Sequence, residues 1–249
     1  MKSLNRYNPI RSYTILRLSL FLLGVIWSCD SGENQSSTNR PRKPAGTERT
    51  YTQQAAEQPT DERVILFYGN SLTAGYGIEP AQAFPALIGA KLDSAGYHYK
   101  VVNAGLSGET TAGGRSRIGW VLRQPVSIFV LELGGNDGLR GIPLTATKQN
   151  LQAIIDTVRA KSPEAKIVLA GMQIPPNMGP EYTSRFRELY KELATENNLA
   201  LIPFLLEGVG GVRRLNQPDG IHPTPEGHKI VAKNVWQVLE PLLENDTES

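Results

Sequence analysis

The feature that most constrains the fold is a regular alternation of short apolar runs with longer amphipathic segments. The apolar runs predict buried strands at residues 64–68, 99–103, 128–133, 166–170 and 199–203. Between most of these runs, and after the last, apolar residues recur at helical spacing, which predicts helices over residues 84–95, 143–161, 181–197 and from 225 onward. Strands separated by helices of this length form βαβ units, so we expect an α/β fold with a five-stranded parallel sheet.

The composition is that of a globular protein and excludes several classes of function. Of the 249 residues, 40% are hydrophobic and 20% are charged. The net charge of +2 argues against a nucleic-acid binder. Cys29 is the single cysteine, which excludes an intramolecular disulfide and a cysteine-based metal cluster. Neither an H-E-x-x-H motif nor a P-loop occurs, so we expect no metal and no cofactor.

The first 28 residues have the parts of an export signal. Basic residues are followed by an apolar run at residues 18–27, and Ser28 directly precedes Cys29. An aliphatic residue three positions before a cysteine, with a small residue just before it, resembles the bacterial lipobox. We therefore predict an exported lipoprotein that is anchored in a membrane by lipid on Cys29 and faces the periplasm or the cell exterior. The alternatives are an ordinary signal peptide or an anchor helix, with an incidental cysteine.

A polar segment follows the predicted lipidation site. Residues 30–60 are rich in Ser, Thr, Gln and Pro and contain almost no large aliphatic residue. Such a segment cannot bury enough apolar surface to fold by itself. We therefore divide the chain into a signal peptide at residues 1–28, a lipidated cysteine with a flexible tether at 29–60, and one folded domain at 61–249.

Glycine-rich and polar clusters follow the first three predicted strands. Ser71 lies in a sharp turn after the first, Gly108 in the loop after the second, and Asn136 after the third. The carboxyl ends of parallel strands meet at one edge of a sheet, where α/β proteins bind their ligands. A glycine lets a backbone N–H approach a ligand closely, and an asparagine amide can donate to an oxyanion. These positions are therefore candidates for a catalytic site.

The C-terminal part of the chain supplies a candidate base. A spacing of three residues lets one turn bring the Asp219 carboxylate against the His222 imidazole. His98 lies at a strand entrance, and we expect His228 to be a surface or capping residue of the last helix. Together with Ser71, the pair has the composition of a serine-hydrolase triad.

Four sequence blocks in this order resemble the SGNH, or GDSL, hydrolase family. They lie at residues 69–72, 103–108, 134–137 and 219–222, and the stretches 131–141 and 219–223 are most similar to the bacterial thioesterase I, lysophospholipase and arylesterase subfamily. The resemblance implies a three-layer α/β/α, flavodoxin-like fold. It also implies that Ser71 is the nucleophile, that His222 is the general base and that Asp219 orients it. The oxyanion hole would comprise the N–H groups of Ser71 and Gly108 and the side chain of Asn136.

Asn70 departs from the family pattern, which has aspartate at this position. The amide can keep the local hydrogen bonds while removing a charge, so we expect an active enzyme and an active Asn70→Asp variant.

The predicted function is that of a monomeric serine esterase acting on small-molecule esters or thioesters of the aryl ester, lysophospholipid or acyl-thioester type. The loop at residues 171–182 either walls an acyl pocket or is a plain surface loop. The alternatives for the function are a carbohydrate acetylesterase on the same fold and a non-catalytic ligand-binding lipoprotein.

Overall fold

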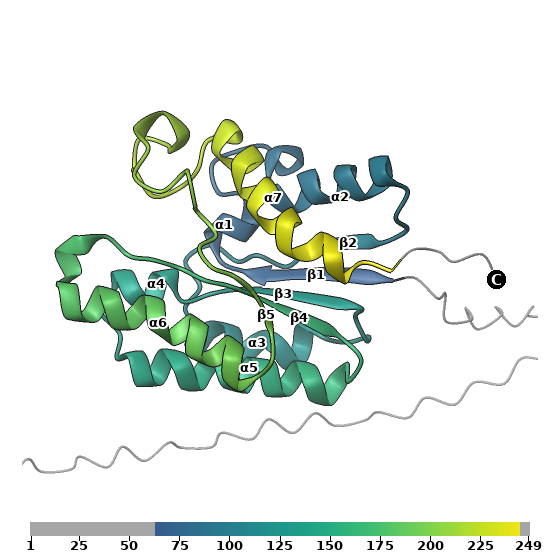
Figure 1. The fold of residues 1–249 in the computed structure, drawn as a ribbon, viewed down its shortest axis with the longest axis horizontal. Helices are drawn as coiled ribbons and strands as arrows, with labels where there is room; N and C mark the ends of the chain where they lie inside the picture. Colours follow the sequence, from purple (N-terminus) through teal and green to yellow (C-terminus); the bar gives the residue numbers. More distant parts are fainter. Residues whose placement is uncertain (1–62, 245–249) are drawn as a thin grey trace, which may run out of the picture. The chain divides into compact units, whose positions relative to one another are not determined.

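Five strands form one parallel sheet in the computed structural model, which describes residues 63–244 (Figure 1). The predicted signal peptide, Cys29 and the tether up to residue 60 lie outside the described residues. The strands lie side by side in the order β2-β1-β3-β4-β5. Their bounds are β1 (Val64–Gly69), β2 (Lys100–Asn103), β3 (Ile128–Glu132), β4 (Lys166–Ala170) and β5 (Ala200–Ile202).

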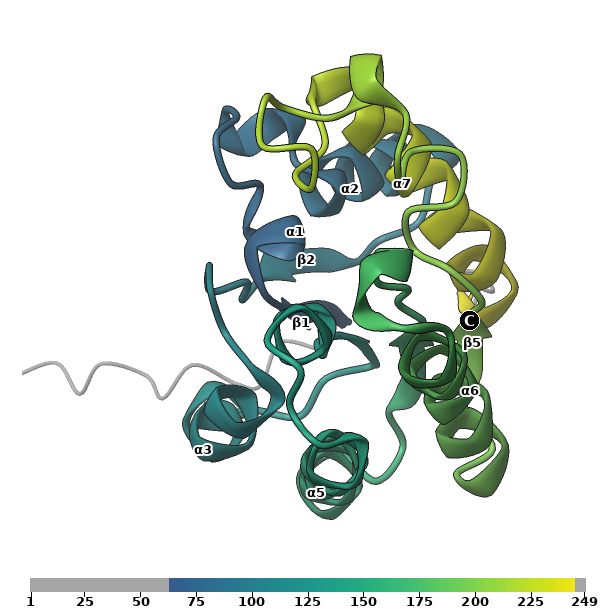
Figure 2. The same cartoon turned by 90° about the vertical axis from the view of Figure 1, so that its left-hand side faces the viewer.

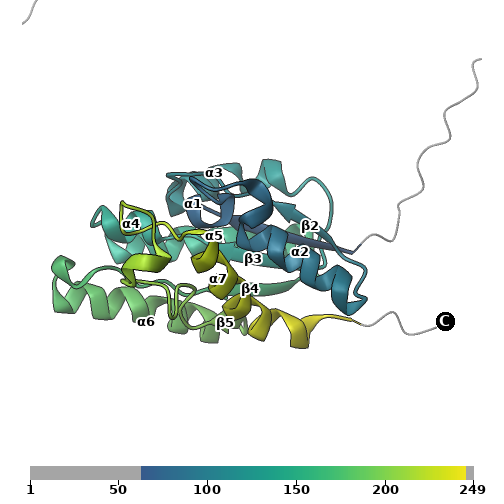
Figure 3. The same cartoon turned by 90° about the horizontal axis from the view of Figure 1, so that it is seen from above.

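Helices cover both faces of the sheet. One face is covered by α2 (Phe84–Ala95) and α7 (Pro225–Leu239), the other by α3 (Thr111–Val121), α5 (Leu144–Lys161) and α6 (Pro180–Glu196) (Figures 1 and 2). Figure 3 looks onto α2 and α7 from above the sheet. The predicted three-layer arrangement is therefore confirmed. No described helix between residues 63 and 244 combines the length and apolarity that crossing a membrane requires.

Because helices cover both faces, the central strands are apolar almost throughout. All five residues of β3 are buried, and the parallel register places Phe129 between Leu66 of β1 and Ile167 of β4. The helices add the expected apolar stripes to this core. In α5, for example, Leu151, together with the residues three, four and seven positions later, is completely buried.

Helix α3 was not predicted, because its sequence lacks an amphipathic pattern. Gly113 and Gly114 lie in its first half, where glycine lowers helix propensity. Tertiary packing explains the second of these glycines, since a Cβ at Gly114 would clash with the side chain of Leu133. The Thr110 side chain caps the helix by accepting a hydrogen bond from the Gly113 N–H.

Short elements occupy the carboxyl ends of the strands. Helix α1 (Ser71–Ala74) follows β1, and α4 (Gly135–Leu139) follows β3. The remaining elements are single turns of 3₁₀ helix, namely η1 (Pro80–Gln82), η2 (Pro176–Met178), η3 (Arg213–Leu215) and η4 (Glu240–Leu242). Figure 2 looks onto this edge of the sheet. The loops that hold Ser71, Gly108 and Asn136 start from three neighbouring strands, whereas Asp219 and His222 lie in the segment after β5.

Candidate active site

The nucleophile candidate lies in a tight turn between β1 and α1. Asn70 is the N-cap of α1, and its Oδ1 accepts a hydrogen bond from the Leu72 N–H at 3.0 Å. An asparagine oxygen is a favoured partner for the free N–H groups of a helix start. Ser71 is therefore the first residue of the helix, and it is 9% exposed.

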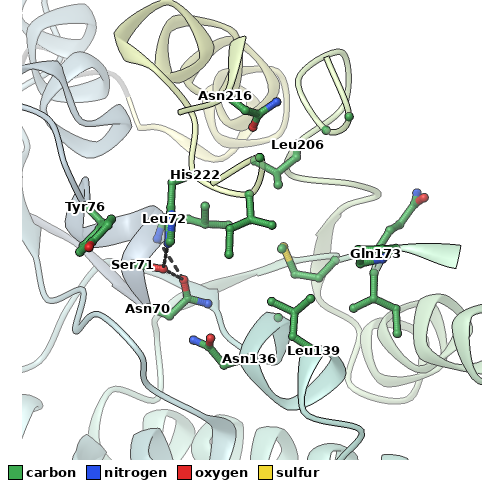
Figure 4. Close-up of a pocket in the computed structure, with 18 of the residues that line it drawn as sticks. Asn70, Ser71, Leu72, Tyr76, Asn136, Leu139, Gln173, Leu206, Asn216 and His222 are labelled. Atoms are coloured by element: carbon green, nitrogen blue, oxygen red, sulfur yellow. Dashed lines mark hydrogen bonds between the residues drawn. The ribbon is translucent and has the colours of Figure 1, made fainter. Parts of the chain in front are cut away.

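Ser71, His222 and Asp219 form a continuous hydrogen-bonded chain. His222 Nε2 is 2.9 Å from Ser71 Oγ (Figure 4). His222 Nδ1 is 2.7 Å from Asp219 Oδ2. The other carboxylate oxygen, Oδ1, accepts from the N–H groups of Ile221 and His222, both at 3.0 Å. The three-residue spacing thus forms the turn that the sequence predicted. The ring of Tyr76 packs against His222 with 4.7 Å between the ring centroids.

Asp219 is held in its ionised form by local hydrogen bonds. Loss of hydration is the largest single effect and favours the neutral acid, but the hydrogen bonds from the His222 side chain and from two backbone N–H groups together outweigh it. Together they lower the pKa of Asp219 to about 2. At neutral pH the carboxylate therefore faces Nδ1 of the imidazole, which leaves Nε2 to face the serine hydroxyl.

The predicted oxyanion-hole residues line the same cavity as Ser71. Gly108 has a φ of +80°, a conformation that favours glycine, and its carbonyl accepts from Arg140 at 3.2 Å. Asn136 Nδ2 donates one hydrogen to the Glu109 carbonyl at 2.9 Å. A primary amide has two N–H groups, so the second can serve a ligand. Figure 4 shows the Asn136 amide on the same side of the cavity as Asn70 and Ser71.

A cavity of about 510 Å³ opens beside Ser71, and most of its wall is apolar. Residues 172–176 of the loop at residues 171–182 form part of the cavity wall. Of the two interpretations of this loop, a pocket wall therefore fits and a plain surface loop does not. Figure 4 shows Leu139 and Leu206 on the walls away from Ser71. Further apolar side chains in the lining are Met172, Ile174, Pro175, Phe204 and Ile221. The cavity therefore suits an apolar group attached to the carbonyl that reaches Ser71.

A buried carboxylate beneath the nucleophile turn was missed by the sequence analysis. Glu132 ends β3, is 1% exposed, and accepts hydrogen bonds from Asn70 and Thr73. Burial raises the pKa of Glu132 to about 7, against the opposing effect of these hydrogen bonds. The available signal was a charged residue inside an otherwise apolar strand.

Two further acidic residues hold the loops that contain the predicted oxyanion-hole residues. Asp137 is fully buried and accepts from the N–H and hydroxyl of Thr111, which joins the start of α4 to the start of α3. Glu109 pairs with Arg117, whose Nη2 also donates to the Ala104 carbonyl at 2.8 Å. The loop that contains Gly108 is thereby tied to α3.

His228 differs from its prediction, because it is buried and faces the interior. Its Nδ1 accepts a hydrogen bond from the Phe84 N–H at 3.2 Å, and burial lowers its pKa to about 4. A neutral ring in this position fixes the start of α2 against α7.

Within residues 63–244, no three His, Cys, Asp or Glu side chains are grouped so that they could hold a metal ion.

Comparison with known proteins places the chain in a family. The profile of the GDSL-like lipase/acylhydrolase family matches residues 67–230. The chain is 44% identical over 193 residues to the esterase TesA of Pseudomonas aeruginosa, which covers 77% of this chain and 92% of that protein. It is 38% identical over 184 residues to the thioesterase 1/protease 1/lysophospholipase L1 of Escherichia coli, which covers 74% and 86%.

A solved structure supports the same assignment. The psychrotrophic esterase EstA of a Pseudoalteromonas species, crystallised after inhibition by monoethylphosphonate, superposes with a TM-score of 0.69 at 30% identity. The match covers 74% of this chain and all of the esterase. The fold, the sequence blocks and these relatives agree, so the chain belongs to the GDSL-like lipase/acylhydrolase family, the SGNH hydrolases, and hydrolyses ester bonds.

Proposed function

We propose that the protein is a serine esterase that cleaves carboxylic esters or thioesters with Ser71, His222 and Asp219 as its catalytic triad. The observation that carries this proposal is the continuous chain of contacts, 2.7 Å from Asp219 to His222 and 2.9 Å from His222 to Ser71, at the wall of an apolar cavity. Nucleophile, base and orienting acid are all within the distances that such a mechanism needs.

The reaction would proceed in two halves. Ser71 Oγ attacks the substrate carbonyl carbon while its proton moves to His222 Nε2, and the carbonyl π electrons move onto oxygen. Collapse of the tetrahedral intermediate breaks the bond to the leaving alkoxide or thiolate, which takes the proton from His222. A water molecule then attacks the acyl-enzyme, with His222 again accepting and returning the proton. The products are the alcohol or thiol and the free acid.

Three donors would stabilise the negative oxygen of each intermediate. They are the N–H groups of Ser71 and Gly108 and the second N–H of the Asn136 amide. The Gly108 and Asn136 segments are joined to each other, because the Asn136 amide also donates to the Glu109 carbonyl. The Glu109 side chain in turn pairs with Arg117. Removing one such donor typically lowers kcat by about 10²–10³-fold. We expect an Asn136→Ala variant to show a loss in that range.

The lining of the cavity favours an apolar substrate group. Long acyl chains of lysophospholipids or acyl-thioesters and the rings of aryl esters all present such a group, and the relative from Escherichia coli bears thioesterase and lysophospholipase activities in its name. The alternative, a carbohydrate acetylesterase, calls for a polar wall that can hydrogen-bond a sugar. Residues such as Leu139, Met172 and Leu206 do not supply one.

The test compares labelling and turnover of the wild type and two variants. A fluorophosphonate should label the wild type at Ser71, and Ser71→Ala should abolish both labelling and ester hydrolysis while leaving the fold intact. Ser94→Ala on the exposed side of α2 is the matched control. Rates are then measured on aryl esters of increasing acyl length, acyl-CoA, lysophospholipid and an acetylated sugar. Full activity of Ser71→Ala would refute the triad, and a preference for the acetylated sugar would favour the alternative.

We also propose that the enzyme is a lipoprotein anchored through Cys29 and facing the periplasm or the cell exterior. The support is the sequence alone, in which the only cysteine directly follows an apolar run and a small residue. Cys29→Ala should block lipidation and shift the mature protein from the membrane fraction to the soluble fraction. A wild-type protein that is soluble and begins at another residue would refute the anchor and leave the triad untouched.

A further inference from the structure

Glu132 is a fully buried carboxylate to which the proposed mechanism gives no role. It lies at the end of β3 and accepts four hydrogen bonds across the sheet from the nucleophile turn. Its Oε2 accepts from the N–H of Asn70 at 3.1 Å and from the N–H and hydroxyl of Thr73 at 3.3 Å and 2.8 Å. Its Oε1 accepts from Asn70 Nδ2 at 2.7 Å. A buried carboxylate without such donors would be costly, so this set of contacts specifies its position.

The two oxygens of Glu132 have different tasks. Oε2 holds the backbone of the turn, while Oε1 faces a single group, the Asn70 amide nitrogen. Because that nitrogen donates to Glu132, the amide oxygen must point the other way, toward the Leu72 N–H at 3.0 Å and Ser71 Oγ at 3.3 Å. Glu132 therefore decides which end of the Asn70 amide meets the nucleophile.

The orientation of that amide matters for Ser71. Its hydroxyl oxygen has two polar neighbours, His222 Nε2 at 2.9 Å and Asn70 Oδ1 at 3.3 Å, as the dashed lines in Figure 4 show. Asn70 Oδ1 accepts from the Ser71 hydroxyl, whose single proton can also be directed to His222 Nε2. Since both neighbours act as acceptors, the serine lone pairs stay free to attack a carbonyl. An inverted amide would instead donate an N–H to Ser71 Oγ and occupy a lone pair. It would also set its N–H against the Leu72 N–H, two donors facing each other.

We propose that Glu132 is a positioning residue for the nucleophile, acting through the Asn70 amide that it orients. This inference rests on the proposed role of Ser71. It assigns to the Glu132–Asn70 pair a donor and acceptor order that must be complementary, with the acceptor on residue 132 and the donor on residue 70. In Asn70→Asp the same requirement is met when one of the two facing carboxyl groups keeps a proton. The order can be reversed by mutation, which makes the inference testable.

The Glu132→Gln variant keeps the shape of the side chain but removes the complementary order of donor and acceptor between residues 132 and 70. The oxygen of the introduced amide can take the place of Oε2 and keep the three donors there. The nitrogen of that amide then faces Asn70 Nδ2, so the Asn70 amide is driven to invert. Misplacement of a reacting group by small distances can cost about 10²-fold, and we expect a fall of that order in kcat with little change in KM.

The double variant Asn70→Asp/Glu132→Gln restores the order with the roles exchanged. The nitrogen at position 132 now donates to a carboxylate at position 70, whose second oxygen still accepts from the Leu72 N–H. The three donors to residue 132 keep an amide oxygen as their acceptor. We therefore expect the double variant to recover most of the lost kcat. A carboxylate next to Ser71 favours protonated His222, so the rates are compared at a pH above the acidic limb of each profile.

The experiment measures kcat and KM on an aryl ester, and the rate at which a fluorophosphonate labels Ser71, in the full chain. Slow labelling and low kcat in Glu132→Gln, with recovery in the double variant, would support the proposal. Glu132→Gln that reacts as fast as the wild type would overturn it. If Glu132→Gln does not fold, as judged by circular dichroism, the double variant decides. A folded and active double variant supports the proposal, and an unfolded or slow one overturns it.

The Ser71→Ala control separates this inference from the proposed function. Hydrolysis that survives in Ser71→Ala would refute the triad itself. Loss of hydrolysis in Ser71→Ala, together with normal kcat and labelling in Glu132→Gln, would leave the triad standing and remove only the positioning role.

Discussion

Two carboxylates are each linked to Ser71 through one intervening side chain, Asp219 through His222 and Glu132 through Asn70, and their surroundings differ. Asp219 lies in a partly exposed loop, and its partners are within three residues along the chain. Glu132 is buried at the end of a central strand, and its partners are about sixty residues away in sequence. Hydrogen bonds lower the pKa of Asp219 to about 2, whereas burial raises that of Glu132 to about 7. The same functional group is thus set to a fixed charge in one place and near its titration range in the other.

The Asp219–His222 turn and the Glu132 cluster depend on the rest of the molecule to different degrees. The Asp219–His222 turn is assembled from neighbouring residues, so the loop itself supplies the geometry. The Glu132 cluster exists only after β1 and β3 have paired, since its donors lie in the turn and short helix that follow β1 and its acceptor ends β3. We therefore expect variants of the loop to affect mainly catalysis, and variants of the buried cluster to affect stability and catalysis together.

Of the changes that separate the two carboxylates, Asp219→Asn is expected to have the largest effect. The amide cannot stabilise the imidazolium that forms at His222, and it can hold the ring in the wrong tautomer. In a triad of this type the equivalent change lowers kcat on the order of 10⁴-fold. The thermal unfolding midpoint should change little, because the loop is partly exposed. A kcat within tenfold of the wild type would show that Asp219 does not orient His222.

The sequence predicted the fold and the contact between Asp219 and His222 because each depends on local patterns. Apolar runs located all five strands, and the spacing of Asp219 and His222 forms a turn that needs no partner elsewhere. It did not predict α3, whose Gly114 is required by a neighbouring strand, or the role of Glu132. Both depend on contacts between distant segments, which leave no periodic trace in a single sequence. The buried state of His228 was missed for the same reason.

A second prediction concerns the pH dependence of stability. The folded-state pKa of Glu132 is about 7 against an ordinary 4.5, so folding is favoured by its protonated form. This contribution is fully present below pH 4.5 and is lost as the pH rises through 7. A shift of this size corresponds to about 3 kcal/mol. For Asp219 the sign is opposite, since its lowered pKa stabilises the fold above pH 3.8 and that contribution is lost as the pH falls through about 2.

Urea unfolding of the wild type and of Glu132→Gln at several pH values isolates the effect. The free energy of unfolding of the wild type should fall relative to that of the variant between pH 4.5 and 7. The other titratable groups are common to both proteins and cancel in the difference. A difference that does not change over this range would mean that Glu132 titrates at its ordinary pKa.

A third prediction uses one glycine beside each carboxylate. A Cβ at Gly69 would clash with Thr73 Oγ1 and lie 2.5 Å from Glu132 Oε2, so Gly69→Ala overpacks the buried cluster. Overpacking typically costs about 1–3 kcal/mol. Gly220 has a φ of +77° and no atom within 4 Å of a Cβ, so Gly220→Ala meets only backbone strain of about 1 kcal/mol. Chemical denaturation should rank the two, and a smaller loss for Gly69→Ala would contradict the packing argument.

The smallest effect is expected from Thr73→Val, which removes one of the three donors to Glu132 Oε2 while preserving the shape of the side chain. The loss of one hydrogen bond should lower the free energy of unfolding by about 1 kcal/mol. Because that bond lowers the pKa of Glu132, its removal should move the stability transition to higher pH. The contact that orients Asn70 involves the other oxygen, so kcat should fall much less than in Glu132→Gln, and Thr73→Ser should restore the transition. An equal loss of kcat in Thr73→Val and Glu132→Gln would mean that the whole cluster, rather than the orientation of the Asn70 amide, determines the reactivity of Ser71.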